Sequence, residues 1–348
     1  MQTRIEVGIL GATGMVGQHF IKFLQGHPWF NLKWLGASDR SAGKKYAEAM
    51  TWHLGVVPET VAGITVDECK PGNAPRLLFS AMDASVATEI ERAFAEAGHV
   101  VVSNSRNHRM ERDVPLLVPE INADHLKLIP GQQRARGWTG QIVTNPNCST
   151  IGLAMALGPL KQFGIQKVIV TTMQAISGAG YPGVASMDIM GNVVPFIGGE
   201  EEKMQQETQK ILGDFRGDHI EPLAAKVSAH CNRVGVVDGH TETVSVEFSH
   251  KVTEADVRQA LESFRGVPQE RDLPSAPKRP VIYMQDANRP QPRKDADRER
   301  GMAAFVGRLR PCPALDYKFV VLSHNTVRGA AGAAVLNAEL MHSEGMLD

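Results

Sequence analysis

The sequence has 348 residues, of which 43% are hydrophobic and 22% are charged, and this length suggests about two domains. Its 37 Lys and Arg side chains nearly balance its 38 Asp and Glu side chains, so no overall field would attract nucleic acid or an anionic membrane. The four cysteines lie far apart and form no C-x-x-C pair, which argues against a disulfide framework and against a metal site. Without a signal-peptide pattern or a membrane-spanning apolar run, the sequence predicts a cytoplasmic protein with a small-molecule partner.

The N-terminal part alternates between predicted strands and helices. Residues 4–10 alternate around Ile5, Val7 and Ile9, and after a glycine turn apolar residues recur at helical spacing as far as Leu24. Further strands are predicted at residues 31–38, 76–81 and 99–103, with a helix at 84–97 that Asp83 would cap. This alternation is typical of an α/β, Rossmann-type domain with a doubly wound parallel sheet.

The pattern changes after residue 148. Residues 166–174, 241–250, 302–309 and 317–323 are predicted strands with few helices between them, which indicates a second α+β domain with a largely antiparallel sheet. One face of that sheet could serve a subunit interface, so we expect a homodimer or homotetramer.

The C-terminal residues complete the predicted domain organisation. Residues 326–343 predict one helix that returns to the first domain, and the charged, Pro-rich residues 288–300 predict an exposed loop. We therefore expect an NADP-binding domain of residues 1–147 plus 326–348, and a catalytic and dimerisation domain of residues 148–325.

The glycine turn after the first strand predicts a dinucleotide site. Gly11, Gly14 and Gly17 open a helix whose backbone N–H groups and dipole could hold a pyrophosphate, although the same spacing would also suit a tight turn with close helix packing. The predicted cofactor contacts in this turn and at the end of strand 76–81 are Gly11, Thr13, Gly14, Met15, Val16 and Ser80.

The end of the second predicted strand bears on the choice between NAD and NADP. Asp39 favours NAD, because an acid there can bind the ribose 2′-hydroxyl. Ser38, Arg40, Ser41 and Lys44 favour NADP, because hydroxyl and basic groups accept a 2′-phosphate. A charged, solvated turn is the alternative to either site, and we predict NADP.

Cys148 is the predicted nucleophile. Asn147 is a good N-cap for a helix from residue 149 to 157, so the thiol would lie at a helix N-terminus, where the dipole lowers a thiol pKa. A lone cysteine is more often a buried structural residue, and we expect this of Cys69 and Cys312.

With these motifs the chain resembles the aspartate-β-semialdehyde dehydrogenases, particularly the branch typical of archaea and fungi. The motifs that carry the resemblance come in the family's order and span nearly the whole chain: residues 11–17, 145–150, Gln174 with 177–180, 200–203, Arg233 with His240, and 324–332. The resemblance implies a glyceraldehyde-3-phosphate-dehydrogenase-like fold. It also implies an oxidoreductase that reversibly converts L-β-aspartyl phosphate to L-aspartate-β-semialdehyde with NADPH, in lysine, threonine and methionine biosynthesis.

The resemblance also implies roles for individual residues. Cys148 would form a thioester with the acyl group, His240 would exchange the proton as acid and base, and Gln174 would orient the thioester. Arg233 would bind the substrate carboxylate, and a glutamate among residues 200–202 would bind its ammonium, for which we choose Glu200.

The remaining implied residues bind phosphate and the nicotinamide. Lys203 would neutralise the phosphate together with Asn104 and Arg109, with Arg106 as the competing choice in the same loop. Ser177 and Gly178 would let the backbone approach the nicotinamide, and Asn325 is expected near the same ring.

Four other classes of protein share some of these features. An acyl-CoA reductase of the malonyl-CoA type would share the cofactor and the thiol but would need no ammonium partner, and N-acetylglutamyl-phosphate reductases usually have a different motif around the thiol. Short-chain dehydrogenases need a Tyr four residues before a Lys, and none of the four tyrosines is so placed. A non-catalytic NADP-binding regulator would have no use for Cys148 with its predicted partners.

Overall fold

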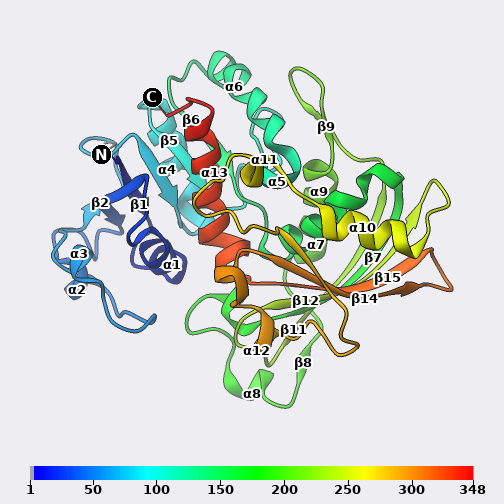
Figure 1. The fold of residues 1–348 in the computed structure, drawn as a ribbon. Helices are drawn as coiled ribbons and strands as arrows, with labels where there is room; N and C mark the ends of the chain where they lie inside the picture. Colours follow the sequence, from blue (N-terminus) through cyan, green and yellow to red (C-terminus); the bar gives the residue numbers. More distant parts are fainter. Residues whose placement is uncertain (1–3, 348) are drawn as a thin grey trace.

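The computed structural model describes residues 4–347, which contain two large sheets (Figure 1). The six strands of the first sheet are all parallel, in the order β3-β2-β1-β4-β5-β6. They are β1 (Ile5–Leu10), β2 (Phe30–Ala37), β3 (Asp67–Glu68), β4 (Leu77–Ser80), β5 (Val100–Ser103) and β6 (Gln141–Thr144). The predicted Rossmann-type sheet is thus confirmed.

Helices cover both faces of this sheet. On one face, α1 (Met15–Leu24) and α13 (Gly332–Ser343) share a hydrophobic core with alternate residues of the strands, such as Ile9 and Phe79. On the other face, α4 (Ala84–Glu96) packs Phe94 against Leu78 and Val101, and Asp83 caps the helix as predicted, 2.8 Å from the N–H of Ser85. Shorter helices in this part of the chain are α2 (Tyr46–Ala49), α3 (Glu59–Ala62), α5 (Pro119–Asn122) and α6 (Ile129–Arg136).

The second sheet is mixed, in the order β13-β14-β15-β12-β7-β11-β8. The pairs β11–β7 and β13–β14 are parallel and the other four are antiparallel, so the predicted largely antiparallel sheet is confirmed. The strands are β7 (Ile165–Gln174), β8 (Val193–Val194), β11 (Lys226–Val234), β12 (His240–Phe248), β13 (Val281–Met284), β14 (Ala304–Pro311) and β15 (Tyr317–Ser323). A separate small hairpin consists of β9 (Asp214–Phe215) and β10 (Ile220–Glu221).

The longer helices of this part of the chain cover one face of the second sheet. Residues of α7 (Cys148–Leu157), α9 (Glu200–Ile211) and α10 (Glu254–Ser263) share one core with the inward residues of β7, β11 and β12. On the opposite face, β7 exposes alternate side chains, and Ile169 is 46% exposed. Other short helices here are α8 (Ser186–Ile189), α11 (Val267–Glu270) and α12 (Pro292–Asp295).

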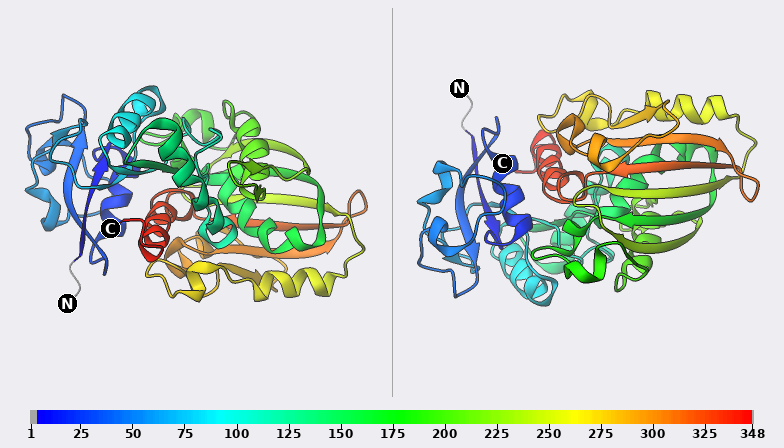
Figure 2. Two further views of the ribbon diagram at one scale, coloured as in Figure 1. Left: turned by 90° about the horizontal axis from the view of Figure 1, so that it is seen from above. Right: turned by 90° about the horizontal axis from the view of Figure 1, so that it is seen from below.

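The C-terminal helix lies between the two sheets in all three views (Figures 1 and 2). Its core contacts are with the first sheet, although the division of the chain at residues 147 and 326 stays a prediction. Among residues 4–347, no helix has the length and apolarity to cross a membrane.

Two sequence predictions are corrected. The single helix predicted at residues 326–343 begins as a π-helix, Val327–Ala331, before it continues as α13. The predicted exposed loop at residues 288–300 is organised around fully buried Asp295, which accepts the backbone N–H of Gln291 at 2.7 Å and pairs with Arg289 and Arg298. A buried carboxylate with this many donors orders the segment, and its charged composition alone conceals that.

Candidate active site

Cys148 begins α7, directly after the link from β6. The side-chain oxygen of Asn147 accepts the N–H groups of Ser149 at 2.9 Å and Thr150 at 3.2 Å, so the predicted N-cap is confirmed. The Cys148 Sγ lies 3.2 Å from the Nε2 of His240. The fold thus brings the thiol into contact with a histidine that is 92 residues away in sequence.

Three further candidates come from neighbouring strand ends of the second sheet. Gln174 ends β7 and lies beside Arg233 of parallel β11, whereas β12 runs antiparallel to β7 and therefore begins with His240 at the same edge. All three side chains are buried. Arg233 donates to the carbonyl of Ala175 at 2.8 Å, and Gln174 donates to the hydroxyl of Thr172 at 3.2 Å.

The hydrogen bonds of His240 define its protonation. Its Nδ1 accepts the backbone N–H of Ala175 at 3.0 Å, so the neutral ring carries its proton on Nε2, which faces the sulfur. Burial, with Arg233 nearby, lowers the pKa of His240 to about 3. A second proton would have to enter at Nδ1, where the Ala175 N–H already points. In this structure the ring therefore faces the sulfur as a neutral hydrogen-bond donor, and its expected role as acid and base stays a prediction.

The Cys148 thiol does not have the lowered pKa that a helix N-terminus predicts. Burial raises the pKa of Cys148 to about 12, and Glu200 adds to the effect, whereas Arg233, Arg109 and the Ser149 N–H act in the opposite direction. Loss of water around the sulfur outweighs the nearby positive charge and the helix dipole. The direction of this shift opposes the expected thiolate at neutral pH, and the role of Cys148 as nucleophile stays a prediction.

The acidic residues at the start of α9 have different surroundings. Glu200 is buried, accepts the side-chain amide of Asn147 at 2.7 Å and pairs with Lys203 at 3.0 Å. Glu201 instead accepts the backbone N–H of Cys231 at 3.0 Å, and Glu202 is exposed. Of the three, only Glu200 borders the segment that carries the thiol, and its contact with substrate stays a prediction.

The loop after β5 supplies the predicted phosphate ligands. Arg109 is buried and donates to the carbonyl of Asn104 at 2.7 Å, whereas Arg106 is exposed. The Arg109 Nε and the Asn104 Nδ2 are both buried and have no hydrogen-bond partner among residues 4–347. Two unpaired buried donors near the thiol would be satisfied by an anion, which favours Arg109 over Arg106.

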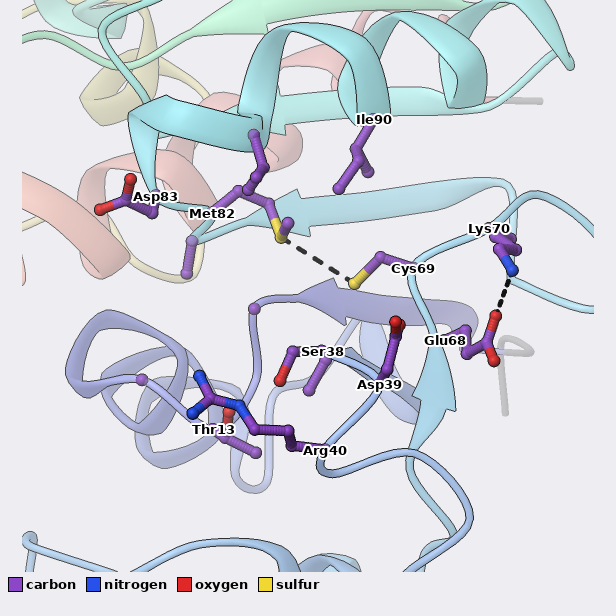
Figure 3. Close-up of a pocket in the computed structure, with 15 residues that line it drawn as sticks. Thr13, Ser38, Asp39, Arg40, Glu68, Cys69, Lys70, Met82, Asp83 and Ile90 are labelled. Atoms are coloured by element: carbon purple, nitrogen blue, oxygen red, sulfur yellow. Dashed lines mark hydrogen bonds and ion pairs between the residues drawn. The ribbon is translucent and has the colours of Figure 1, made fainter.

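A cavity of about 720 Å³ lies at the glycine turn (Figure 3). Gly11, Thr13, Gly14, Ser38 and Arg40 line it, and Figure 3 shows the Arg40 side chain extending toward Thr13. Gly11 has φ +76°, and a Cβ there would lie 2.7 Å from the carbonyl oxygen of Ala81, so the turn requires glycine.

The other predicted cofactor residues have different surroundings. Met15 and Val16 are the first residues of α1, and Ser41 is 8% exposed behind the lining. Ser80 is fully buried and its hydroxyl donates to Glu91 at 2.5 Å, so its side chain is already engaged.

The residues predicted near the nicotinamide lie beside His240. Asn325 donates to the Ser177 hydroxyl at 2.7 Å and accepts the Gly239 N–H at 2.8 Å. A Cβ on Gly178 would lie 2.8 Å from the Arg233 Nη1 and 3.1 Å from the His240 Cε1. The backbone at residue 178 therefore borders the same site as the thiol.

Sequence reasoning missed two buried charged residues of α9. Glu207 binds both Arg109 and the backbone N–H of Asn147, and the Lys210 ammonium donates to three carbonyl groups of the loop that follows β5. These two residues and Glu200 and Lys203 are spaced three or four residues apart, so all four lie on one side of the helix. Such a row of charged residues in a sequence usually indicates a solvent-exposed helix face, and it therefore gave no sign of burial.

Fold and site together define a two-domain, dinucleotide-binding dehydrogenase of the semialdehyde dehydrogenase class. The model of the semialdehyde dehydrogenase NAD-binding domain matches residues 6–129, and the model of the dimerisation domain matches residues 157–328. The chain is 52% identical to the aspartate-semialdehyde dehydrogenase of Methanothermobacter thermautotrophicus, covering 97% of this chain and 99% of the relative. It is 46% identical to that of Saccharomyces cerevisiae, covering 98% of each. This chain belongs to the aspartate-semialdehyde dehydrogenase family.

Solved structures agree with this assignment. Aspartate-semialdehyde dehydrogenase with NADP from Candida albicans superposes with a TM-score of 0.92 at 44% identity, covering 99% of this chain and 100% of that one. The Vibrio cholerae enzyme II, complexed with ASA, superposes with a TM-score of 0.78 at 28% identity, covering 99% of each chain.

Proposed function

We propose that this chain reversibly converts L-β-aspartyl phosphate and NADPH to L-aspartate-β-semialdehyde, phosphate and NADP. The observation that carries the proposal is the approach of His240, Arg233 and Arg109 to one cysteine, where the buried Nε of Arg109 has no partner among residues 4–347. A thiol can hold an acyl group, and flanking cations suit a substrate with a carboxylate at one end and a phosphate at the other. The reaction is a step toward lysine, threonine and methionine.

The cavity at the glycine turn fits NADP. The positive φ of Gly11 and the N-terminus of α1 suit a pyrophosphate, and Ser38 and Arg40 in the lining suit a 2′-phosphate. When bound, the reduced cofactor supplies hydride to the acyl carbon. Ser177, Gly178 and Asn325 would border the nicotinamide, because they lie beside His240 and the thiol.

The raised thiol pKa points to deprotonation during attack. As the Cys148 sulfur bonds to the acyl carbon, the acyl–oxygen bond breaks, and the thiol proton leaves with the phosphate as HPO₄²⁻. Lys203, Arg109 and Asn104 would bind that phosphate, which stabilises the charge where it develops. The free enzyme thereby keeps a neutral sulfur that reacts only when the acyl phosphate is in place.

We propose that His240 stabilises each anion through its Nε2–H. The first anion is the oxygen of the tetrahedral adduct after hydride transfer, and the second is the thiolate that leaves as this adduct collapses to the aldehyde. The thiolate then takes up one proton from solvent, which restores the neutral thiol. The Ala175 N–H keeps the ring in the required tautomer. Gln174 would hold the acyl oxygen from the neighbouring strand end.

Substrate recognition would use the two ends of the amino-acid group. Arg233 would bind the α-carboxylate, because its guanidinium lies at the strand edge beside Gln174. Glu200 would bind the ammonium from the start of α9, and its existing bonds to Asn147 and Lys203 would fix the carboxylate in place.

The proposal includes an assembly and a cellular location. The matched dimerisation domain and the exposed side chains on one face of the second sheet support a homodimer or a pair of dimers. Within each chain we place the domain division at residues 147 and 326. Exposed apolar residues between 187 and 196 extend this surface: Met187, Met190, Val193 and Phe196. The four cysteines are unpaired, which supports a cytoplasmic location.

The test follows NADPH formation from aspartate semialdehyde with and without phosphate, beside a Cys148→Ala variant. We expect activity to require both phosphate and the thiol. Equal rates without phosphate, or activity in Cys148→Ala, would refute the mechanism. Coenzyme A replacing phosphate as acyl acceptor would instead indicate an acyl-CoA reductase.

A further inference from the structure

Glu207 is a buried carboxylate that the proposed mechanism does not use. It lies on α9, is 2% exposed, and its two oxygens bind two different parts of the chain. One oxygen accepts the Arg109 Nη1 at 2.9 Å, and the other accepts the backbone N–H of Asn147 at 2.7 Å. A buried charge is stable only when it is paired in this way, so the arrangement is specific.

The two partners of Glu207 belong to the two halves of the proposed reaction. Arg109 lies in the loop after β5 and is a proposed phosphate ligand, whereas Asn147 is the N-cap that places Cys148. One carboxylate therefore sets the distance between the phosphate ligand and the residue before the nucleophile.

Lys210 supports the same loop one helical turn further on. Its ammonium donates to the carbonyl oxygens of Arg109 at 2.7 Å, Glu111 at 2.8 Å and Val114 at 2.9 Å. The main chain of Arg109 is thus held by Lys210 and its guanidinium by Glu207. Among residues 4–347 the Nε of Arg109 has no hydrogen-bond partner, so this edge of the guanidinium is the donor that we assign to the phosphate.

We propose that Glu207 is a positioning residue that couples phosphate binding to the nucleophile by fixing Arg109 and the Asn147 N–H at once. The proposal rests on the proposed function, because it concerns the phosphate of that reaction. Loss of the charge frees the guanidinium to turn, which weakens phosphate binding. The Asn147 bond survives in a glutamine, whose oxygen can still accept the N–H, so the chemical step suffers less.

The experiment measures the oxidative direction with phosphate as the varied substrate, in Glu207→Gln and in wild type. Hydrogen bonds between charged groups are strong, so we expect the phosphate KM to rise about 10- to 100-fold. The KM values for NADP and semialdehyde should stay within about twofold, because a loss of one local bond does not reach their sites. Glu262→Gln, at an exposed residue of α10, is the matched control and should behave as wild type.

A double-mutant cycle separates positioning from a general structural role. If Glu207 acts through Arg109, adding Glu207→Gln to Arg109→Gln should leave the phosphate KM of Arg109→Gln unchanged. Additive effects, or a phosphate KM equal to wild type in folded Glu207→Gln, would overturn the proposal. If the glutamine variant does not fold, Glu207→Asp serves, because it keeps the charge but is too short to hold both partners.

Failure of the positioning role is distinct from failure of the proposed function. Wild type that forms NADPH equally well without phosphate would reject the function. Wild type that requires phosphate, with a Glu207 variant that matches it, would reject only the role of Glu207.

Discussion

Replacing Gly329 by alanine should displace the nucleophile. Gly329 lies in the π-helix before α13, and a Cβ built on it would lie 2.8 Å from the Cβ of Cys148 and 3.0 Å from its Cα. Carbon atoms in contact prefer about 3.5–4.0 Å, so the two segments would have to separate by roughly 0.7–1.2 Å. Neither segment yields easily, because Asn147 is bound to Glu207 and the Gly329 N–H donates to the carbonyl of His324 at 2.9 Å.

The expected consequences are a loss of stability and a larger loss of rate. Overpacking of a filled site costs about 1–3 kcal/mol of the free energy of unfolding. A reacting atom misplaced by about 1 Å can lose on the order of 100-fold in kcat. The NADP KM should remain unchanged, because the cavity at the glycine turn is lined by other residues.

Steady-state kinetics and thermal unfolding of Gly329→Ala test this reasoning. The matched control is Gly131→Ala in α6, where a Cβ meets nothing within 4 Å and alanine should be neutral or stabilising by about 0.5–1 kcal/mol. If Gly329→Ala kept kcat within twofold of wild type, the close packing of the π-helix on Cys148 would not control the site.

Three further predictions concern the cofactor site, the role of His240 and the stability at acid pH. Arg40→Ala should raise the KM for NADP about tenfold or more and leave that for NAD unchanged, and equal changes for both would reject a 2′-phosphate contact. His240→Gln, which keeps a donor that does not titrate, should retain about tenfold more activity than His240→Ala, and equal inactivity would exclude a donor role. Burial lowers the pKa of His125 to about 4, below that of the unfolded chain, so the unfolded state binds more protons and stability falls as pH drops from 6.5 toward 4. This group should cost about 2 kcal/mol between pH 7 and 5, and urea unfolding of His125→Asn at both pH values should show that this loss has disappeared.

Local patterns predicted the elements that place the thiol. The alternation of Ile5, Val7 and Ile9 before Gly11 gave the strand and turn, and Asn147 gave the start of α7, because capping and periodicity act within a few residues. The π-helix at residues 327–331 was not predictable in this way. Its extra residue depends on packing against α7, which no local propensity encodes.

The sequence prediction and the structure differ most in the electrostatic surroundings of the site residues. A helix N-terminus lowers a thiol pKa, and the sequence shows the N-terminus, but it does not show how much water the fold removes from the sulfur. The same limit applies to His240, because the sequence does not show that the Ala175 N–H points at its Nδ1. For Glu207 and Lys210 the sequence shows only charged residues at helical spacing. Their binding partners lie in the loop after β5, far away in the sequence.

Buried charges hold the two segments that flank Cys148. On one side Glu207 and Glu200 hold the main chain and the side chain of Asn147. On the other side Arg328, beside Gly329, is fully buried and binds both oxygens of Glu120, at 2.7 and 2.6 Å. Breaking such a pair leaves an uncompensated charge at a cost of about 3–5 kcal/mol, so the π-helix cannot move away from the thiol without that penalty. A thiol with a raised pKa is a weak nucleophile until the acyl phosphate is correctly placed beside it. A fixed position of the sulfur therefore favours the reaction.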